Sequence, residues 1–142
     1  MALVVSVLHI YIVNFLRRTK MGLDAYLMAK KQVTNEEGAQ ELESKELYYW
    51  RKHHDLHGWM EAFYRAQGGT EEYFNCVPVE LTSQDLDKLE EDVKLTKLPP
   101  TQGFFFGNNP PDEESIAQDL EAIAAAREAI ADGFVVYYDS WW

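Results

Sequence analysis

A chain of 142 residues is long enough for one domain with its own hydrophobic core. Hydrophobic residues make up 46% of the chain and aromatic residues 13%, which excludes an intrinsically disordered protein. The single cysteine, Cys76, excludes an internal disulfide framework and a cysteine-rich zinc module, and it fits a reducing compartment. We expect Cys76 to be a small buried hydrophobic residue rather than a nucleophile.

The net charge of −11 is unevenly distributed along the chain. Residues 1–20 contain three basic residues and no acidic one, which leaves 10 basic against 24 acidic residues from Met21 onward. Such an acidic body repels phosphate groups, so direct nucleic-acid binding is excluded as a function class. Two explanations of the acidity stay open: it provides solubility, or it imitates the charge of a nucleic acid and occupies a basic partner.

Residues 1–20 differ in composition from the rest of the chain. Their apolar run covers about 15 residues, fewer than the roughly 20 needed for a helix to cross a bilayer. The run lacks the basic start and the small-residue cleavage site of a secretory signal. Three interpretations stay open: an upstream in-frame extension before a natural start at Met21, a packed helix or strand, or a short membrane anchor followed by Arg17 and Arg18. Residues 21–142 are expected to form a single domain.

The first half of this domain predicts a strand followed by a long helix. Residues 22–29 alternate in polarity, as a strand does when one face is buried. Residues 34–44 are polar and predict a loop or the tip of a hairpin. A helix is expected over residues 44–67, ended by Gly68 and Gly69. Its apolar face would hold Tyr49, Leu56, Trp59, Met60, Phe63 and Tyr64.

The second half predicts two strands and two helices. Residues 73–81 form a strand that Pro78 restricts to an edge or a bulge. A helix capped by Thr82 or Ser83 runs to about Leu95, and a third runs over residues 112–131 until Gly133 ends it. Residues 104–106 are three phenylalanines, either a short strand or a hydrophobic plug. The last strand, residues 134–142, is apolar on both sides, as in a central strand. The expected fold is therefore α+β: a small, mostly antiparallel sheet of three to four strands packed against about three helices.

Four basic or titratable residues fall on faces that should point into the core: Lys52, His53, His57 and Arg127. A buried charge is costly unless it is paired. One interpretation is a set of buried salt bridges with the strand residues Asp24, Glu80 and Asp139. The other is a cleft in which Lys52, His57 and Arg127 converge on an anionic ligand. The expected ligand-binding residues are Lys52, His53, His57, Arg127, Trp50, Tyr64 and Asp24, with Trp50 and Tyr64 as walls; no catalytic residue is assigned.

Metal and cofactor chemistry have little support in the sequence. His53 and His57 are spaced by four, as in zinc-binding helices, but His54 stands where an H-E-x-x-H motif has glutamate. A third ligand would have to come from Asp24 or Asp139. The sequence contains no glycine-rich phosphate loop, dinucleotide fingerprint or nucleophile elbow. We therefore expect no metal site and no cofactor.

Three segments carry a resemblance to a known family. They are the GLD-x-YL segment at residues 22–27, the YWRK-x-x-x-LHGWM-like segment within residues 49–60, and the YYDSWW end at residues 137–142. From Met21 onward the chain resembles a family of small bacteriophage and bacterial proteins with no established activity. The resemblance supplies no catalytic residues. It implies a phage-associated, cytoplasmic setting, and it implies that residues 1–20 lie outside the family's usual length.

Three functions remain as hypotheses. The first is an accessory protein of phage type that binds a host or phage protein through its acidic surface. The second is a binding protein or small enzyme for a phosphorylated or carboxylated molecule at Lys52, His57 and Arg127. The third is a nucleic-acid mimic that inhibits a basic partner. Membrane association is expected only if residues 1–20 act as an anchor.

Overall fold

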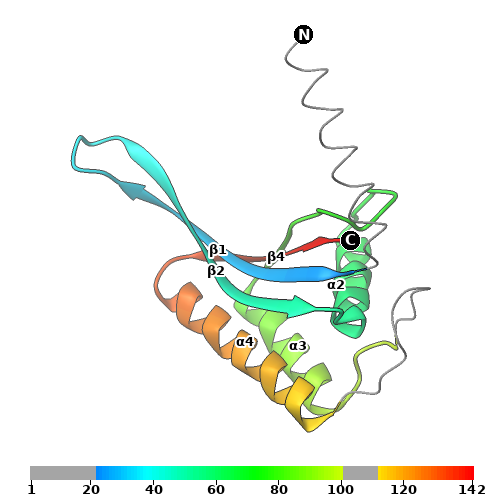
Figure 1. The fold of residues 1–142 in the computed structure, drawn as a ribbon. Helices are drawn as coiled ribbons and strands as arrows, with labels where there is room; N and C mark the ends of the chain where they lie inside the picture. Colours follow the sequence, from blue (N-terminus) through cyan, green and yellow to red (C-terminus); the bar gives the residue numbers. More distant parts are fainter. Residues whose placement is uncertain (1–21, 101–111) are drawn as a thin grey trace.

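The computed structural model describes residues 22–100 and 112–142, and four strands of this part form one sheet (Figure 1). The strands are β1 (Asp24–Thr34), β2 (Gln40–Arg51), β3 (Val79–Leu81) and β4 (Val135–Trp141), in the spatial order β2-β1-β4-β3. Every neighbouring pair is antiparallel. The α+β prediction is confirmed, and β4 lies between two strands as its apolar sequence indicates.

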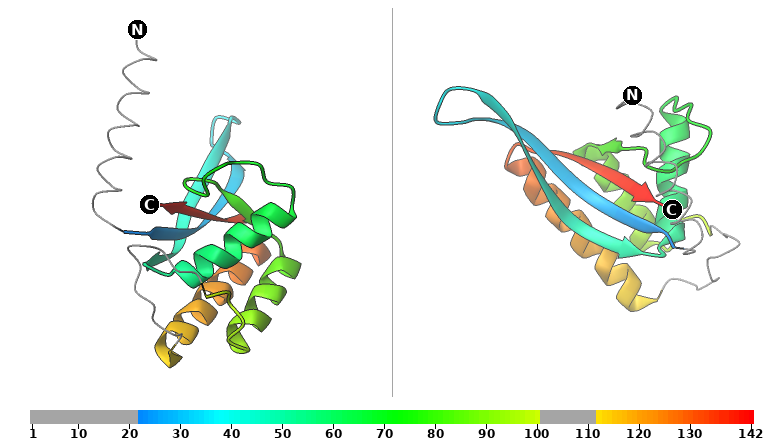
Figure 2. Two further views of the ribbon diagram at one scale, coloured as in Figure 1. Left: turned by 90° about the vertical axis from the view of Figure 1, so that its right-hand side faces the viewer. Right: turned by 45° about the horizontal axis from the view of Figure 1, so that its top comes forward.

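Three helices accompany the sheet: α2 (His54–Ala66), α3 (Ser83–Lys94) and α4 (Glu113–Ala131). Figures 1 and 2 show α3 and α4 across one face of the sheet, with α2 at the end where β1 begins and β4 ends. Thr82 and Asp85 form a capping box at the start of α3, and the Asp112 side chain caps α4 by accepting a hydrogen bond from the Ser115 N–H. The predictions for these two helices are confirmed. None of the helices in the described ranges is both apolar enough and long enough to span a bilayer.

The prediction of one helix over residues 44–67 is wrong in its first part. Residues 44–51 belong to β2, and the helix begins only at His54. Lys45, Glu46 and Leu47 favour a helix locally, whereas the three aromatic residues that follow favour a strand. Pairing with β1 overrides this preference, because Trp50 lies opposite Ala25 and Tyr48 opposite Leu27, where both side chains reach the core.

The hairpin of β1 and β2 extends beyond the body of the domain (Figure 1). The pairing shifts between Leu27 and Met28, which leaves Leu47 as an extra residue in β2. Such a bulge bends the strand and increases its twist. From Lys31 onward β1 pairs only with β2, so residues 31–43 form a two-stranded ribbon, called here the arm. The hairpin-tip interpretation of residues 34–44 is thereby confirmed.

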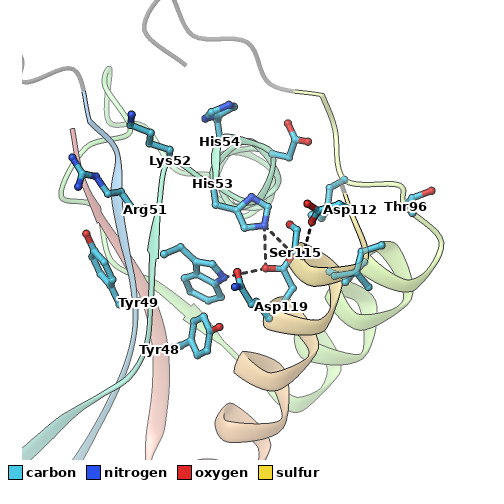
Figure 3. A pocket seen from close by; sticks show the side chains of 16 residues that line it. Tyr48, Tyr49, Arg51, Lys52, His53, His54, Thr96, Asp112, Ser115 and Asp119 are labelled. Atoms are coloured by element: carbon cyan, nitrogen blue, oxygen red, sulfur yellow. Dashed lines mark hydrogen bonds and ion pairs between the residues drawn. The ribbon is translucent and has the colours of Figure 1, made fainter. Parts of the chain in front are cut away.

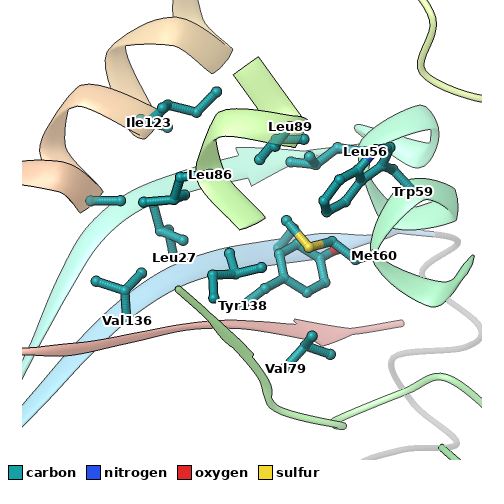
Figure 4. Close-up of a cluster of buried hydrophobic side chains, with 14 of the residues drawn as sticks. Leu27, Leu56, Trp59, Met60, Val79, Leu86, Leu89, Ile123, Val136 and Tyr138 are labelled. Atoms are coloured by element: carbon teal, nitrogen blue, oxygen red, sulfur yellow. The ribbon is translucent and has the colours of Figure 1, made fainter. Parts of the chain in front are cut away.

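The core lies between the sheet and the helices (Figure 4). Alternate residues of β1 are buried, as predicted, and they face apolar side chains of α3 and α4 together with Leu56, Trp59 and Met60 of α2. Of the strand predicted over residues 73–81 only Val79–Leu81 forms, and it lies at an edge, in agreement with Pro78. Cys76 is exposed, so the expectation that it is buried is wrong. Residues 1–20 and 104–106 lie outside the described residues.

Candidate functional site

A polar groove opens where β2 ends, between the first turn of α2 and the first two turns of α4 (Figure 3). Its volume is about 340 Å³. Tyr48 and Trp50 of β2 lie on one side, and Val93 of α3 and Thr96, which follows this helix, line the groove as well. The groove combines basic and acidic side chains, namely Lys52, His53, His54, Asp55, Asp112 and Asp119, whereas the side chain of Arg51 points away from it (Figure 3).

The carboxylate of Asp119 is the centre of the polar contacts in this groove. It is 3% exposed, and its Oδ1 accepts a hydrogen bond of 3.0 Å from the indole N–H of Trp50. The Nε2 atom of His53 lies 3.0 Å from Oδ1 and 2.8 Å from Oδ2. Dashed lines in Figure 3 mark these contacts. Asp119 therefore joins the end of β2, the start of α2 and the second turn of α4.

His53 uses both ring nitrogens within the fold. Its Nδ1 accepts a hydrogen bond of 3.4 Å from the backbone N–H of Leu56, which makes it the N-cap of α2. Because Nδ1 is an acceptor, the ring proton is on Nε2, and this N–H donates a hydrogen bond to the carboxylate of Asp119. A histidine held at both nitrogens has no free atom with which to take a substrate proton. The Trp50, His53 and Asp119 contacts therefore form a clamp between elements rather than an acid-base pair.

Lys52 lies at the rim of the groove, in the turn between β2 and α2. Its φ angle is 60°, in the left-handed region that few residues other than glycine adopt. Its backbone N–H donates a 2.7 Å hydrogen bond to the carbonyl of Leu23, which fixes the turn against the start of β1. The side chain is exposed. The expectation that a helix aims Lys52 into the core is therefore wrong.

His57 is in the core and outside the groove. It is 8% exposed, and its Nδ1 lies 2.8 Å from the hydroxyl of Tyr138. Burial lowers the pKa of His57 to about 4, against a smaller raising effect of a hydrogen bond to the backbone of Phe74. Burial also raises the pKa of the Tyr138 hydroxyl well above its usual value. Both groups are therefore neutral near pH 7, and His57 is a hydrogen-bonded core residue.

Arg127 lies between α3 and α4, away from the groove. Its guanidinium contacts Asp87 at 2.8 Å and Glu90 at 2.9 Å. The hydrogen bond from Arg127 is the main reason that the pKa of Glu90 is lowered. The expected convergence of Lys52, His57 and Arg127 on one ligand is thus wrong, and the expected partners Asp24, Glu80 and Asp139 are replaced by α3 carboxylates.

The two remaining predicted residues also lie elsewhere. Tyr64 accepts hydrogen bonds from the backbone N–H groups of Thr70 and Glu71, and it covers Gly69 at the end of α2. Asp24 accepts a hydrogen bond from the Tyr49 hydroxyl on the face of the sheet away from α3 and α4. This bond raises the pKa of Tyr49 to about 12. Of the predicted residues, the groove brings together only Trp50, Lys52 and His53.

Asp119 was not among the predicted site residues, although the sequence contains a signal for it. It lies three residues after Ile116 and four before Ile123, on the apolar stripe of α4. Arg127 was predicted as a site residue because it, too, is a polar residue on this apolar stripe. An acidic residue on such a stripe predicts a buried acceptor for a tryptophan or histidine of the facing element.

Within residues 22–100 and 112–142, no three His, Cys, Asp or Glu side chains gather closely enough to hold a metal ion. His53 and His57 point to different partners, so their spacing of four does not produce a pair of ligands. Comparison of the chain with protein-family models, with curated proteins and with solved structures finds no match.

Proposed function

We propose that this protein is a phage-type accessory protein that binds a host or phage protein, with the acidic arm as the contact element. The observation that carries the proposal is the arm itself, a ribbon whose side chains contribute little to the core of the domain. A two-stranded ribbon adds little stability on its own in water. A contact with another molecule would explain why the chain extends two strands so far from its body.

The charge of the arm favours a basic partner. Residues 31–43 include four exposed glutamates, Glu36, Glu37, Glu41 and Glu43, against the single basic residue Lys31. Leu42, in the middle of the glutamates, is 64% exposed. A large apolar side chain surrounded by like charges fits a contact in which the apolar residue is buried and the charges meet cationic groups.

The test is photo-crosslinking in cells that produce the protein. A photoreactive residue replaces Leu42 in one variant and the exposed Gln84 of α3 in another. We expect crosslinks to a basic protein from position 42 and none to it from position 84. Replacing the four arm glutamates by glutamine should abolish the crosslinks, whereas the same change at Glu71, Glu91, Glu121 and Glu128 should not. Identical crosslinks from both positions would reject the arm as the contact element.

The two other hypotheses have less support. An anionic ligand in the groove would meet Asp55, Asp112 and Asp119 beside Lys52, and Arg127 lies elsewhere. Nucleic-acid mimicry is compatible with the arm, since its glutamates are exposed. The mimicry hypothesis also requires that DNA or RNA compete with the arm for binding to the crosslinked partner.

A further inference from the structure

The face of the sheet opposite α3 and α4 carries a cluster of aromatic and acidic side chains. The register places Tyr26 of β1 between Tyr49 of β2 and Asp139 of β4. Residues directly opposite one another point to the same side of a sheet. Tyr137 and Trp141, two positions on either side of Asp139, therefore share this face. No helix of residues 22–100 and 112–142 covers it (Figure 2).

Asp139 is the central carboxylate of this cluster. It is half-buried, and among the described residues its carboxylate accepts one hydrogen bond, from the backbone N–H of Ser140 at 2.8 Å. No lysine, arginine or histidine of the described residues pairs with it; the nearby basic side chains on the face are Lys30 and Arg51. Burial raises the pKa of Asp139. Burial removes part of the hydration of the Asp139 carboxylate, and no cation of the described residues replaces it. A ligand that brings a cation to this carboxylate therefore stabilises its charged form.

The aromatic rings around Asp139 suit the same kind of ligand. The Tyr26 and Tyr49 ring centroids are 5.3 Å apart, and Lys30 places its ammonium 5.0 Å from the ring centre of Tyr137. The fold itself thus already holds one cation over a ring of this face. Rings attract cations through their quadrupole, and a carboxylate among rings adds a full charge.

We propose that this face binds a lysine or arginine side chain from an extended segment of a partner protein, with Asp139 as the counter-charge and Tyr26, Tyr137 and Trp141 as the surrounding rings. The inference concerns a second contact surface and does not depend on the arm. Tyrosine and tryptophan are enriched among the residues that dominate protein interfaces. An extended segment is the geometry in which alternate side chains reach one face of a sheet.

Charge selects this occupant over the other candidates. The acidic residues of the face, Asp24, Glu46, Glu80 and Asp139, outnumber Lys30 and Arg51. The body from Met21 onward is more acidic still. A second copy of the chain and a nucleic acid would each bring like charge to this surface, whereas a basic segment brings the opposite charge.

The test uses the full chain and the capped pentapeptide Lys-Val-Lys-Val-Lys, followed by NMR at low salt. We expect the largest shifts at the Trp141 indole and the Asp139 backbone, and a lower pKa of the Asp139 carboxyl when the peptide is bound. A pentapeptide with glutamine in place of lysine should not bind. Asp139→Asn should weaken binding about tenfold, as the loss of one partly buried charge partner predicts.

Controls separate this site from general acidity and from the arm. Glu128→Gln removes the same charge from an exposed position of α4 and should change the affinity less than about twofold. The variant with four arm glutamines should retain the peptide shifts at Trp141. Equal losses for Asp139→Asn and Glu128→Gln, shifts confined to the arm, or no shifts on this face would each overturn the proposal. Lysine amide binding as tightly as the pentapeptide would also overturn it, because the face would then recognise a small amine.

Discussion

The indole N–H of Trp50 donates a hydrogen bond of 3.0 Å to the buried carboxylate of Asp119, across the gap between β2 and α4. The same relationship recurs at 2.9 Å between Trp59 of α2 and Asp92 of α3. Each buried tryptophan of the domain thus has an aspartate on the apolar side of a facing helix. These pairs fix the positions of the helices, because an indole N–H buried without an acceptor is costly.

Asp119→Ala should destabilise the domain by about 2–4 kcal/mol, since it leaves the donors of Trp50 and His53 without their acceptor. Urea unfolding followed by circular dichroism measures this change. Glu121→Ala, an exposed residue of the same helix, is the matched control and should change stability by less than about 0.5 kcal/mol. Similar losses for both variants would show that the clamp contributes nothing specific.

Acid should weaken the fold through His57. Its folded-state pKa of about 4 lies below the ordinary histidine value of 6.5, so the unfolded chain binds the proton more readily. The stability due to the neutral imidazole is therefore complete above pH 6.5 and is lost as the pH falls toward 4. The loss amounts to about 3 kcal/mol over this window.

Unfolding free energies of the wild-type chain and of His57→Gln, measured between pH 7 and pH 4, test this assignment. The variant starts less stable, because it loses the contact with Tyr138, but its stability should fall less steeply with acid. A slope unchanged in His57→Gln would assign the acid sensitivity to other groups.

Arg127→Met should have a small effect on stability, about 0–1 kcal/mol, in spite of two short ion pairs. The Arg127 side chain is 34% exposed and that of Asp87 67%, so water and salt screen the attraction. The difference between variant and wild type should therefore vanish in about 1 M salt, where the screening length is only a few ångströms. A large, salt-independent loss would instead indicate that the apolar stem of Arg127 packs into the core.

Shortening the arm should leave the body intact. A variant in which an Asn-Gly turn replaces residues 33–41 keeps the pairing of β1 with β4 and all the helix contacts. We expect a thermal midpoint within a few degrees of the wild type, since less than about 1 kcal/mol is removed. Differential scanning calorimetry measures this. A collapse of the midpoint would show that the arm stabilises the body and is not available for a partner.

The sequence predicted the elements whose signals are local. Thr82 and Asp112 mark the starts of α3 and α4, and Gly133, with a φ of 90°, marks the end of α4. The alternation in β1 predicted which of its side chains are buried. These features depend on residues within one turn or one strand, which is why a single sequence is enough to find them.

The candidate site was predicted less well, because it depends on where β2 ends. Tyr49 and Lys52 fit a helical stripe with Trp59 and Phe63, and only the distant partner β1 decides for a strand. Once residues 44–51 are extended, Lys52 turns outward and His53 becomes a cap. Because residues 44–51 form a strand and not a helix, Lys52 does not meet Arg127 as expected. No pattern within this segment predicts that outcome.

The hairpin divides after Lys30, where the pairing of β1 with β4 ends, into two parts that can vary independently. On the side of the body, each pair between β1 and β2 is tied to the interior, and a shift by one residue would turn the buried side chains outward. In the arm no side chain belongs to the core, so residues inserted two at a time on each strand preserve the alternation of faces. The reach of the protein toward another molecule can therefore lengthen or shorten over generations while its interior stays the same.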